Sequence, residues 1–175
     1  MKKQDILENQ AKLVYLSLGS NLGNRIENLE KAKFLLFSNN IKIIKVSNFY
    51  ESLSWPNNLH PKYLNIALKI KTTLKIKPLF KLIKSIEKKI GRNKAPKNYP
   101  RKCDIDILDY DGKIVSIYFK QEKIQIPHPR LHKRNFVLIP LQEVTKNWIH
   151  PNNKQKICDL LSNIKNNDLR SIKII

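Results

Sequence analysis

The sequence predicts an α+β protein, and three observations support this class. Stretches in which apolar and polar residues alternate predict strands, and two stretches with apolar residues at helical spacing predict helices. Up to residue 110 these elements follow the order βαββαβ, the ferredoxin-like arrangement of an antiparallel sheet with two helices on one face. The 175 residues are enough to bury a core. We expect residues 1–12 to be an N-terminal extension and residues 13–175 a single domain, with a β-hairpin and C-terminal helices added to this core.

The first part of the chain predicts a strand, a helix and a second strand. Leu13–Gly19 is apolar, aromatic and β-branched, which is typical of a buried strand. Asn24 with Glu27 three residues later resembles the capping box that begins a helix. We expect the helix to end near Ser38 and to bury Ile26, Leu29, the Lys33 stem, Leu36 and Phe37. The apolar stretch Ile41–Tyr50 then predicts the second strand.

The middle of the chain predicts the rest of the core. Lys62–Leu74 alternates regularly and predicts a third strand. Pro78 and Gly91 mark the first turn and the end of a helix, whose apolar residues are Leu79, Leu82, Ile83, Ile86 and Ile90. Arg101–Gly112 predicts a fourth strand that ends in a turn at Asp111 and Gly112, and we expect Lys113–Phe119 to be its hairpin partner.

The last part of the chain predicts a proline-interrupted loop followed by two short helices, over Phe136–Val144 and Lys156–Ile164. No apolar stretch approaches the roughly 20 residues that span a bilayer. Cys103 and Cys158 do not form a metal-binding or disulfide pattern. We therefore expect a cytoplasmic protein with no membrane partner.

The chain is strongly basic, with a net charge of +20. Such a charge suggests nucleic acid as a partner, but the lysines are spread along the chain, which makes nucleic-acid binding the weaker interpretation. The arginines are more informative, because four of the six lie around the acidic stretch 104–111. These four are Arg92, Arg101, Arg130 and Arg134, and the other two are Arg25 and Arg170. A guanidinium group binds phosphate or carboxylate through two parallel hydrogen bonds.

The acidic stretch predicts a metal site. Asp104 and Asp106 are two residues apart in a predicted strand, so they would lie on one face with Cα atoms about 6.5–7 Å apart. Such a pair can hold Mg²⁺, whose shell is completed by water and substrate phosphate. The alternative is a solvated strand face, but two like charges need cations nearby, and Arg101 is three residues away. Asp109 and Asp111 are explained by the turn.

Acids for metal and arginines for phosphate suggest phosphoryl transfer. The four glycines form neither of the glycine-rich nucleotide motifs, so side chains and loops would have to hold any ATP. His128 and His132 are four residues apart, but Pro129 lies between them and no Glu follows His128, which disfavours a zinc site. His128 is either a phosphate or ribose contact or an ordinary loop histidine.

Five stretches together resemble one known family, the 6-hydroxymethyl-7,8-dihydropterin pyrophosphokinases of folate biosynthesis. They occur in the family's order: LGSNLGNR (18–25), YLNIAL (63–68), IEKKIGR (86–92), YPRKCDIDIL (99–108) and IPHPRLHKRNFVLIPL (126–141). The resemblance implies a ferredoxin-like fold with added elements. It also implies an enzyme that transfers pyrophosphate from ATP to the hydroxymethyl group of the dihydropterin, leaves AMP, and uses two Mg²⁺ ions.

The resemblance also implies a role for individual residues at the nucleotide end. Asp104 and Asp106 match the metal-binding pair, and with Arg92 and Arg101 they match the catalytic residues. The ATP contacts correspond to Glu87, Arg92, Lys94, Arg101, His128 and Arg134. Lys94 replaces an arginine that is common in the family, and Tyr99 replaces a tryptophan. Glu87 could instead be a solvated helix residue.

At the pterin end, the matching residues are Asn21, Ser52, Tyr63, Asn65, Asp104 and Phe136. Tyr63 and Phe136 correspond to the aromatic rings that sandwich the pterin, and Asn65 to the amide that pairs with its polar edge. The alternatives are core aromatics and a surface strand residue. We expect small-molecule partners and a monomer.

The rival function is a non-catalytic RNA-binding module on the same fold, although paired acids would repel RNA and the aromatic motif of such modules is absent. A third possibility is a paralogue that has lost the chemistry.

Overall fold

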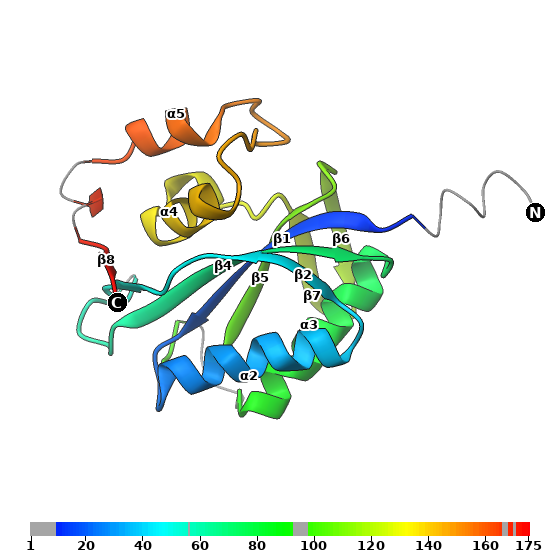
Figure 1. The fold of residues 1–175 in the computed structure, drawn as a ribbon, viewed down its shortest axis with the longest axis horizontal. Helices are drawn as coiled ribbons and strands as arrows, with labels where there is room; N and C mark the ends of the chain where they lie inside the picture. Colours follow the sequence, from blue (N-terminus) through cyan, green and yellow to red (C-terminus); the bar gives the residue numbers. More distant parts are fainter. Residues whose placement is uncertain (1–9, 56, 93–97, 166–167, 170) are drawn as a thin grey trace, which may run out of the picture.

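The computed structural model describes residues 10–55, 57–92, 98–165, 168–169 and 171–175. One sheet forms the middle layer, with helices on both faces (Figure 1). Helices α2 (Arg25–Ser38) and α3 (Ile76–Ile90) cover one face, and α4 (Asn135–Val144) and α5 (Ile157–Ser162) lie on the other side. The sheet strands are β1 (Lys12–Ser20), β2 (Lys42–Val46), β3 (Tyr50–Ser52), β4 (Tyr63–Thr72), β5 (Asp104–Tyr110) and β8 (Lys173–Ile174).

The strand order confirms the predicted ferredoxin-like core. The order is β5-β1-β4-β3-β8, with β2 also paired to β4, and the neighbours run antiparallel. Strand β1 lies in the middle, so the residues opposite it come from both β4 and β5. Gly19 is the register partner of Asn65 on one side and of Asp104 on the other.

Two cores fill the spaces between the layers. Under α2 and α3, the inward residues of the strands pack with the helices, for example Leu16, Leu68 and Ile105 with Ile83. On the other face a smaller core includes Ala67, Leu108, Leu138, Trp148 and Ile157. The alternation along β5 therefore places its isoleucines against α3 and leaves its first two aspartates on the side of α4.

The predicted helix ends are confirmed. The Asn24 side chain accepts a hydrogen bond from the Glu27 N–H at 3.2 Å and begins α2. Gly91 ends α3 with φ of 102°, a conformation that glycine adopts without strain. The expected inward face of α2 was partly wrong: Leu29, Ala32 and Leu36 are buried, whereas Ile26 and Phe37 are exposed. The buried stripe is therefore narrower than expected and is centred on Ala32.

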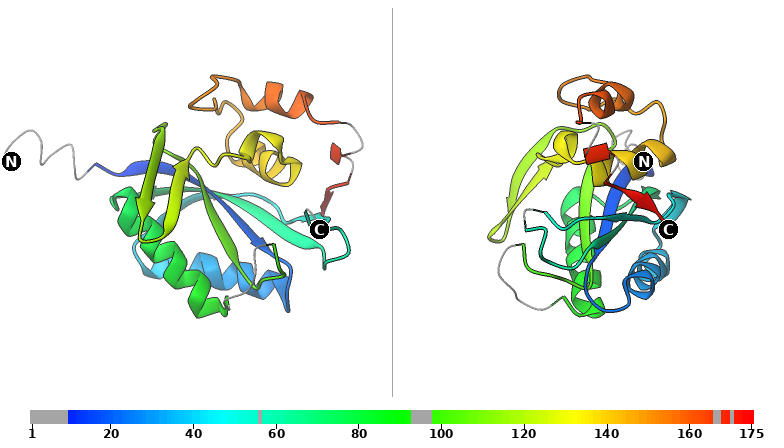
Figure 2. Two further views of the ribbon diagram at one scale, coloured as in Figure 1. Left: turned by 180° about the vertical axis from the view of Figure 1, so that it is seen from behind. Right: turned by 90° about the vertical axis from the view of Figure 1, so that its left-hand side faces the viewer.

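The prediction that Lys113–Phe119 pairs with the preceding strand in a hairpin was wrong. The turn after β5 forms as expected, with the Gly112 N–H donating to the Asp109 carboxylate at 2.9 Å. Strand β6 (Val115–Phe119), however, pairs with β7 (Glu122–Ile126) in a separate two-stranded sheet. Figure 2 shows this hairpin beside the end of the main sheet, where Phe119 of β6 meets Phe80 of α3.

The secondary structure differs from the prediction in three smaller ways. The predicted strand 41–50 is divided into β2 and β3, because Ser47 turns its hydroxyl to the Ala67 N–H between them. A short 3-10 helix, η1 (Leu131–Lys133), precedes α4, and β8 pairs with β3; neither was expected.

Residues 1–9 of the expected N-terminal extension lie outside the described residues. In the described part of the chain, no helix has the length and apolar character that crossing a membrane requires.

The burial of the two cysteines predicts a difference in their reactivity. Cys103 is fully buried, and burial raises the pKa of its thiol to about 12, whereas Cys158 is exposed. Only the thiolate reacts with disulfide reagents such as Ellman's reagent. We expect one fast-reacting thiol in the native protein and two after unfolding in guanidinium chloride, with Cys158→Ser abolishing the fast phase. Two thiols that react equally fast in the native protein would contradict this packing.

Candidate active site

A cavity of about 280 Å³ lies on the face of the sheet that is turned toward α4. Residues from β1, β4 and β5 form its floor, and the loops before β4, before β5 and before α4 form its walls. Ten of the residues selected from the sequence line it: Ser52, Tyr63, Asn65, Arg92, Arg101, Asp104, Asp106, His128, Arg134 and Phe136. These ten residues, from Ser52 to Phe136, lie up to 84 positions apart in the chain, and the fold brings them to one cavity.

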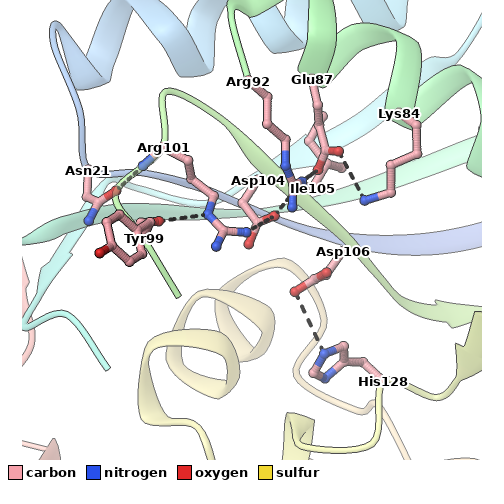
Figure 3. A network of polar contacts seen from close by, with 10 residues as sticks. All are labelled: Asn21, Lys84, Glu87, Arg92, Tyr99, Arg101, Asp104, Ile105, Asp106 and His128. Carbon is pink, nitrogen blue, oxygen red and sulfur yellow. Dashed lines mark hydrogen bonds and ion pairs between the residues drawn. The ribbon is translucent and has the colours of Figure 1, made fainter. Parts of the chain in front are cut away.

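Asp104 and Asp106 lie on the same side of β5, as the strand period predicted, while Ile105 between them is buried in the core under α3. Figure 3 shows both carboxylates on the side of β5 that faces α4 and His128. Their side chains keep 29% and 37% of their surface exposed, so they are accessible from the cavity. The pair therefore meets the first requirement of a cation site.

Asp104 is neutralised by two arginines. Its Oδ1 accepts hydrogen bonds from Arg92 Nη1 at 2.8 Å and from Arg101 Nη1 at 3.2 Å. Burial alone would raise the pKa of Asp104, but Arg101 and Arg92 outweigh it and hold the pKa below its ordinary value. Asp104 is therefore ionised at neutral pH and fixes both guanidinium groups at the edge of the cavity.

Asp106 has a different environment. Its recessed position and the neighbouring Asp104 charge raise its pKa to about 6. The His128 Nε2 lies 3.8 Å from Asp106 Oδ2. Burial, followed by the charges of Arg134 and Arg130, lowers the pKa of His128 to about 4, so this histidine is neutral at pH 7. Among the described contacts, Asp106 thus lacks the direct arginine contacts of Asp104, and an added cation would lower its energy.

Glu87 lies behind this pair and does not line the cavity. Its side chain is 1% exposed, and its Oε1 accepts the Ile105 N–H at 2.8 Å. Lys84 donates to its other oxygen at 3.0 Å, and Arg92 forms an ion pair with it. The expectation of a direct nucleotide contact does not fit this placement, because the carboxylate is occupied in joining α3 to β5 and holding Arg92 (Figure 3).

Asn21 is also behind the wall rather than in it. Its side chain is 2% exposed and bonds to the backbone of Pro61 and Arg101. The expected direct contact with the pterin does not fit this burial. Lys94, the remaining predicted ATP contact, lies outside the described residues.

Aromatic and cationic side chains line the cavity from the sheet and from the wall opposite it. Tyr63 and Phe136 both line the cavity, from β4 and α4. The Arg134 guanidinium carbon lies 5.5 Å from the centre of the Phe136 ring and 5.6 Å from that of Trp55. Arg130 lies 5.4 Å from the same Trp55 ring. Two arginines are thus held by cation–π contacts with their charges at the cavity.

The floor combines a fixed amide with an open space. The Asn65 side-chain nitrogen donates to Ser52 Oγ at 2.9 Å and to the Tyr50 carbonyl at 3.4 Å. Within the described part of the chain its oxygen accepts no side-chain hydrogen bond, so it could accept one from a ligand. Gly19 lies between Asn65 and Asp104, and a Cβ there would be 3.3 Å from both the Asn65 oxygen and the Tyr63 ring. The absence of a side chain at Gly19 keeps the floor flat.

The site residues chosen from the sequence do not include several others that line the cavity, although Arg130 was noted among the arginines around the acidic stretch: Ser17, Gly19, Leu53, Trp55, Lys84, Asn98, Arg130 and Val137. Ser17 and Gly19 alternate with the core leucines 16 and 18, so the strand pattern alone places them on the opposite face. Their position next to Asp106 and Asp104 depends on the register, which no local signal gives. Trp55 lies in a loop without periodicity.

The cavity therefore has two chemically distinct ends. One end carries two carboxylates with Arg92 and Arg101, a combination suited to a polyphosphate with its divalent cations. The other end has aromatic rings and a fixed amide, which suit a flat heterocycle with donors and acceptors along its edge. Transfer of a phosphoryl group between two bound substrates fits this arrangement.

Comparisons with known proteins agree with this geometry. Residues 15–146 match the family model described as 7,8-dihydro-6-hydroxymethylpterin-pyrophosphokinase (HPPK). The chain is 41% identical over 138 residues to 2-amino-4-hydroxy-6-hydroxymethyldihydropteridine pyrophosphokinase of Aquifex aeolicus, covering 79% of the chain and 83% of that protein. It is 35% identical over 172 residues to the folic acid synthesis protein fol1 of Pneumocystis carinii, covering 98% of the chain.

Several relatives are much longer than this chain. The chain spans 22% of the Pneumocystis protein. A solved Plasmodium falciparum HPPK-DHPS structure superposes with a TM-score of 0.77 over 96% of the chain and 48% of its own, at 17% identity, which supports the fold. The rival RNA-binding function finds no support among these matches. The chain belongs to the 7,8-dihydro-6-hydroxymethylpterin-pyrophosphokinase family.

Proposed function

We propose that the protein transfers the terminal pyrophosphate of ATP to the hydroxymethyl group of 6-hydroxymethyl-7,8-dihydropterin, giving AMP and the dihydropterin diphosphate for folate biosynthesis. The observation that carries the proposal is that one cavity holds the carboxylate pair, in which Asp104 is bound by two arginines, together with aromatic rings and a fixed amide. The family match supports the same reaction.

At the nucleotide end, the arginines would hold the phosphates. Arg92 and Arg101 are already oriented by Asp104, so little side-chain freedom is lost when a triphosphate binds. His128 and Arg134 line the neighbouring wall and would contact the nucleotide, as would Lys94. Fixed guanidinium groups stabilise the charge that spreads over the phosphate oxygens during transfer. Glu87 would act indirectly, through Arg92 and the β5 backbone.

Asp104 and Asp106 would hold two Mg²⁺ ions together with the phosphates. The donor set fits: two oxygen ligands from the protein leave room for water and phosphate oxygens, which Mg²⁺ prefers. In the described residues there is no group of three or more His, Cys, Asp or Glu side chains that would form a site without substrate. When bound, the ions neutralise the phosphate oxygens on which negative charge develops.

At the pterin end, Tyr63 and Phe136 would stack on the two faces of the ring, and the Asn65 oxygen would accept from an N–H on its edge. Ser52 would fix the Asn65 amide rather than contact the ring. These groups orient the hydroxymethyl oxygen toward the phosphate end, so the reaction gains from positioning without a covalent enzyme intermediate.

The proposal includes a monomer acting in the cytoplasm. Both cysteines are free thiols, as in a reducing compartment, which supports the cytoplasmic location.

The direct test is to incubate the purified protein with Mg-ATP and 6-hydroxymethyl-7,8-dihydropterin and to separate the nucleotides by chromatography. We expect AMP to form in equal amount to the dihydropterin diphosphate, and only when both substrates are present. ADP as the product, or no nucleotide product at all, would refute the proposed reaction.

The carboxylate pair predicts the effect of removing one charge at a time. We expect Asp104→Asn and Asp106→Asn each to lower kcat by about 100- to 1,000-fold, as loss of a major electrostatic contact does, with the circular dichroism spectrum unchanged. Asp111→Asn is the matched control, because Asp111 lies in the same acidic stretch but at the exposed turn. Near-normal turnover of both site variants would contradict the assignment.

The flat floor predicts a steric effect at Gly19. In Gly19→Ala the new methyl group would press on Tyr63 and Asn65 at 3.3 Å, so both must shift. Displacing a side chain from its rotamer costs about 0.5–1.5 kcal/mol, which corresponds to a roughly two- to tenfold weaker Kd for the pterin. Titration calorimetry with the pterin measures this, and the Kd for Mg-ATP serves as the internal control. An unchanged pterin Kd would show that the ring does not lie over Gly19.

A further inference from the structure

Two loops from distant parts of the chain border the cavity, and both meet at the end of β1. One leads through Pro61 into Tyr63. The other leads through Arg101 into Asp104. Asn21, the first residue after β1, lies between them and is buried to 98% of its surface.

Asn21 bonds to both loops at once. Its Nδ2 donates to the Pro61 carbonyl at 3.2 Å, and its Oδ1 accepts from the Arg101 N–H at 2.8 Å. Its own backbone N–H donates to the Arg101 carbonyl at 3.1 Å. Arg101 is therefore held on both sides of its Cα, as Figure 3 shows for the side-chain bond.

Each bond acts on a residue next to the cavity. The Arg101 backbone sets the origin of the guanidinium group that reaches Asp104 at 3.2 Å. Pro61 lies two residues before Tyr63, and the next carbonyl, that of Lys62, is held by Arg25 Nη1 at 3.0 Å. The loop that ends at Tyr63 is thus attached to the same end of β1 as the phosphate-side arginine.

We infer that Asn21 is a positioning residue that couples the pterin side of the cavity to the phosphate side, without touching either substrate. A side-chain amide suits this role because it offers a donor and an acceptor at once, and here each is used on a different loop. Because the Asn21 side chain is buried, losing either bond would remove one of the two attachments between the end of β1 and these loops. This inference rests on the proposed function and assigns Asn21 a role within it.

Two variants separate the two bonds. Asn21→Asp keeps Oδ1 for the Arg101 N–H but replaces the donor with an oxygen that repels the Pro61 carbonyl. We expect the KM for the pterin to rise about five- to twentyfold, as for one lost buried hydrogen bond, with kcat within about twofold of wild type. Asn21→Ala loses both bonds, so we expect kcat also to fall by about tenfold or more.

Asn28→Ala is the matched control. Asn28 donates through its amide to Ser20 Oγ at 3.2 Å and to the Leu22 carbonyl at 2.9 Å, so it makes two bonds of the same kind close by, but to neither loop. We expect it to leave KM and kcat unchanged. Equal changes in the Asp and Ala variants, or changes in the control as large as theirs, would reduce Asn21 to a general structural residue and overturn the inference.

Amide hydrogen exchange tests the same bonds without turnover. We expect the Arg101 N–H to be protected in the wild type and in Asn21→Asp, and to exchange at least about tenfold faster in Asn21→Ala, because only the last variant lacks its acceptor. Equal protection in all three proteins would overturn the inference. If the wild type makes no AMP while the exchange pattern is as expected, the proposed reaction fails but the coupling of the two loops stands.

Discussion

The repulsion between two neighbouring carboxylates is the constraint around which the site is organised. Asp104 and Asp106 share one face of β5 because side chains alternate along a strand, so the fold cannot separate them. Arg92 and Arg101 neutralise Asp104, and buried Glu87 holds Arg92 from behind. Among the described contacts, Asp106 has no direct arginine partner: its side chain lies near the neutral His128, and the charges of Arg134 and Lys84 act on it from a greater distance. Asp106 is therefore the less neutralised carboxylate of the pair, and the one that would gain more from cations arriving with a substrate under the proposed function.

The antiparallel register places the carboxylates and the Asn65 amide at the same cavity. Strand β1 separates Asp104 from Asn65, and its residue at that level is Gly19. Neighbouring strands lie about 4.8 Å apart, so the carboxylate and the amide are roughly 10 Å apart across a flat floor. Under the proposed function, that span would accommodate the pterin ring and its substituent, with the reacting oxygen directed toward the phosphates. The loops on either side are joined at the end of β1, so the spacing of the two ends does not depend on flexible segments alone.

The sequence predicted the parts of this design that depend on local periodicity. The core order, the common face of Asp104 and Asp106 and the ends of α3 all follow from residue spacing and capping residues. The hairpin partner could not be predicted, because Asp111 and Gly112 give a strong turn signal, whereas the turn between β6 and β7 contains Lys120 at φ of 55° and no glycine. Glu87 lies next to Lys88 and Lys89, so the sequence alone suggests a solvated helix residue. Its burial depends on how α3 packs on β5, which no local pattern predicts. Gly19 and Asn21 gain their significance from register and from loops that meet only in the folded protein.

The central claim is that the paired aspartates bind divalent cations together with the polyphosphate. Electron paramagnetic resonance can count bound Mn²⁺ in the presence of an ATP analogue with a methylene bridge between the α- and β-phosphates, which cannot react. We expect two bound Mn²⁺ ions per wild-type chain when the analogue is present, and fewer than two when Asp106 is replaced by Asn. The same number of ions in both proteins would place the metal elsewhere and contradict the account.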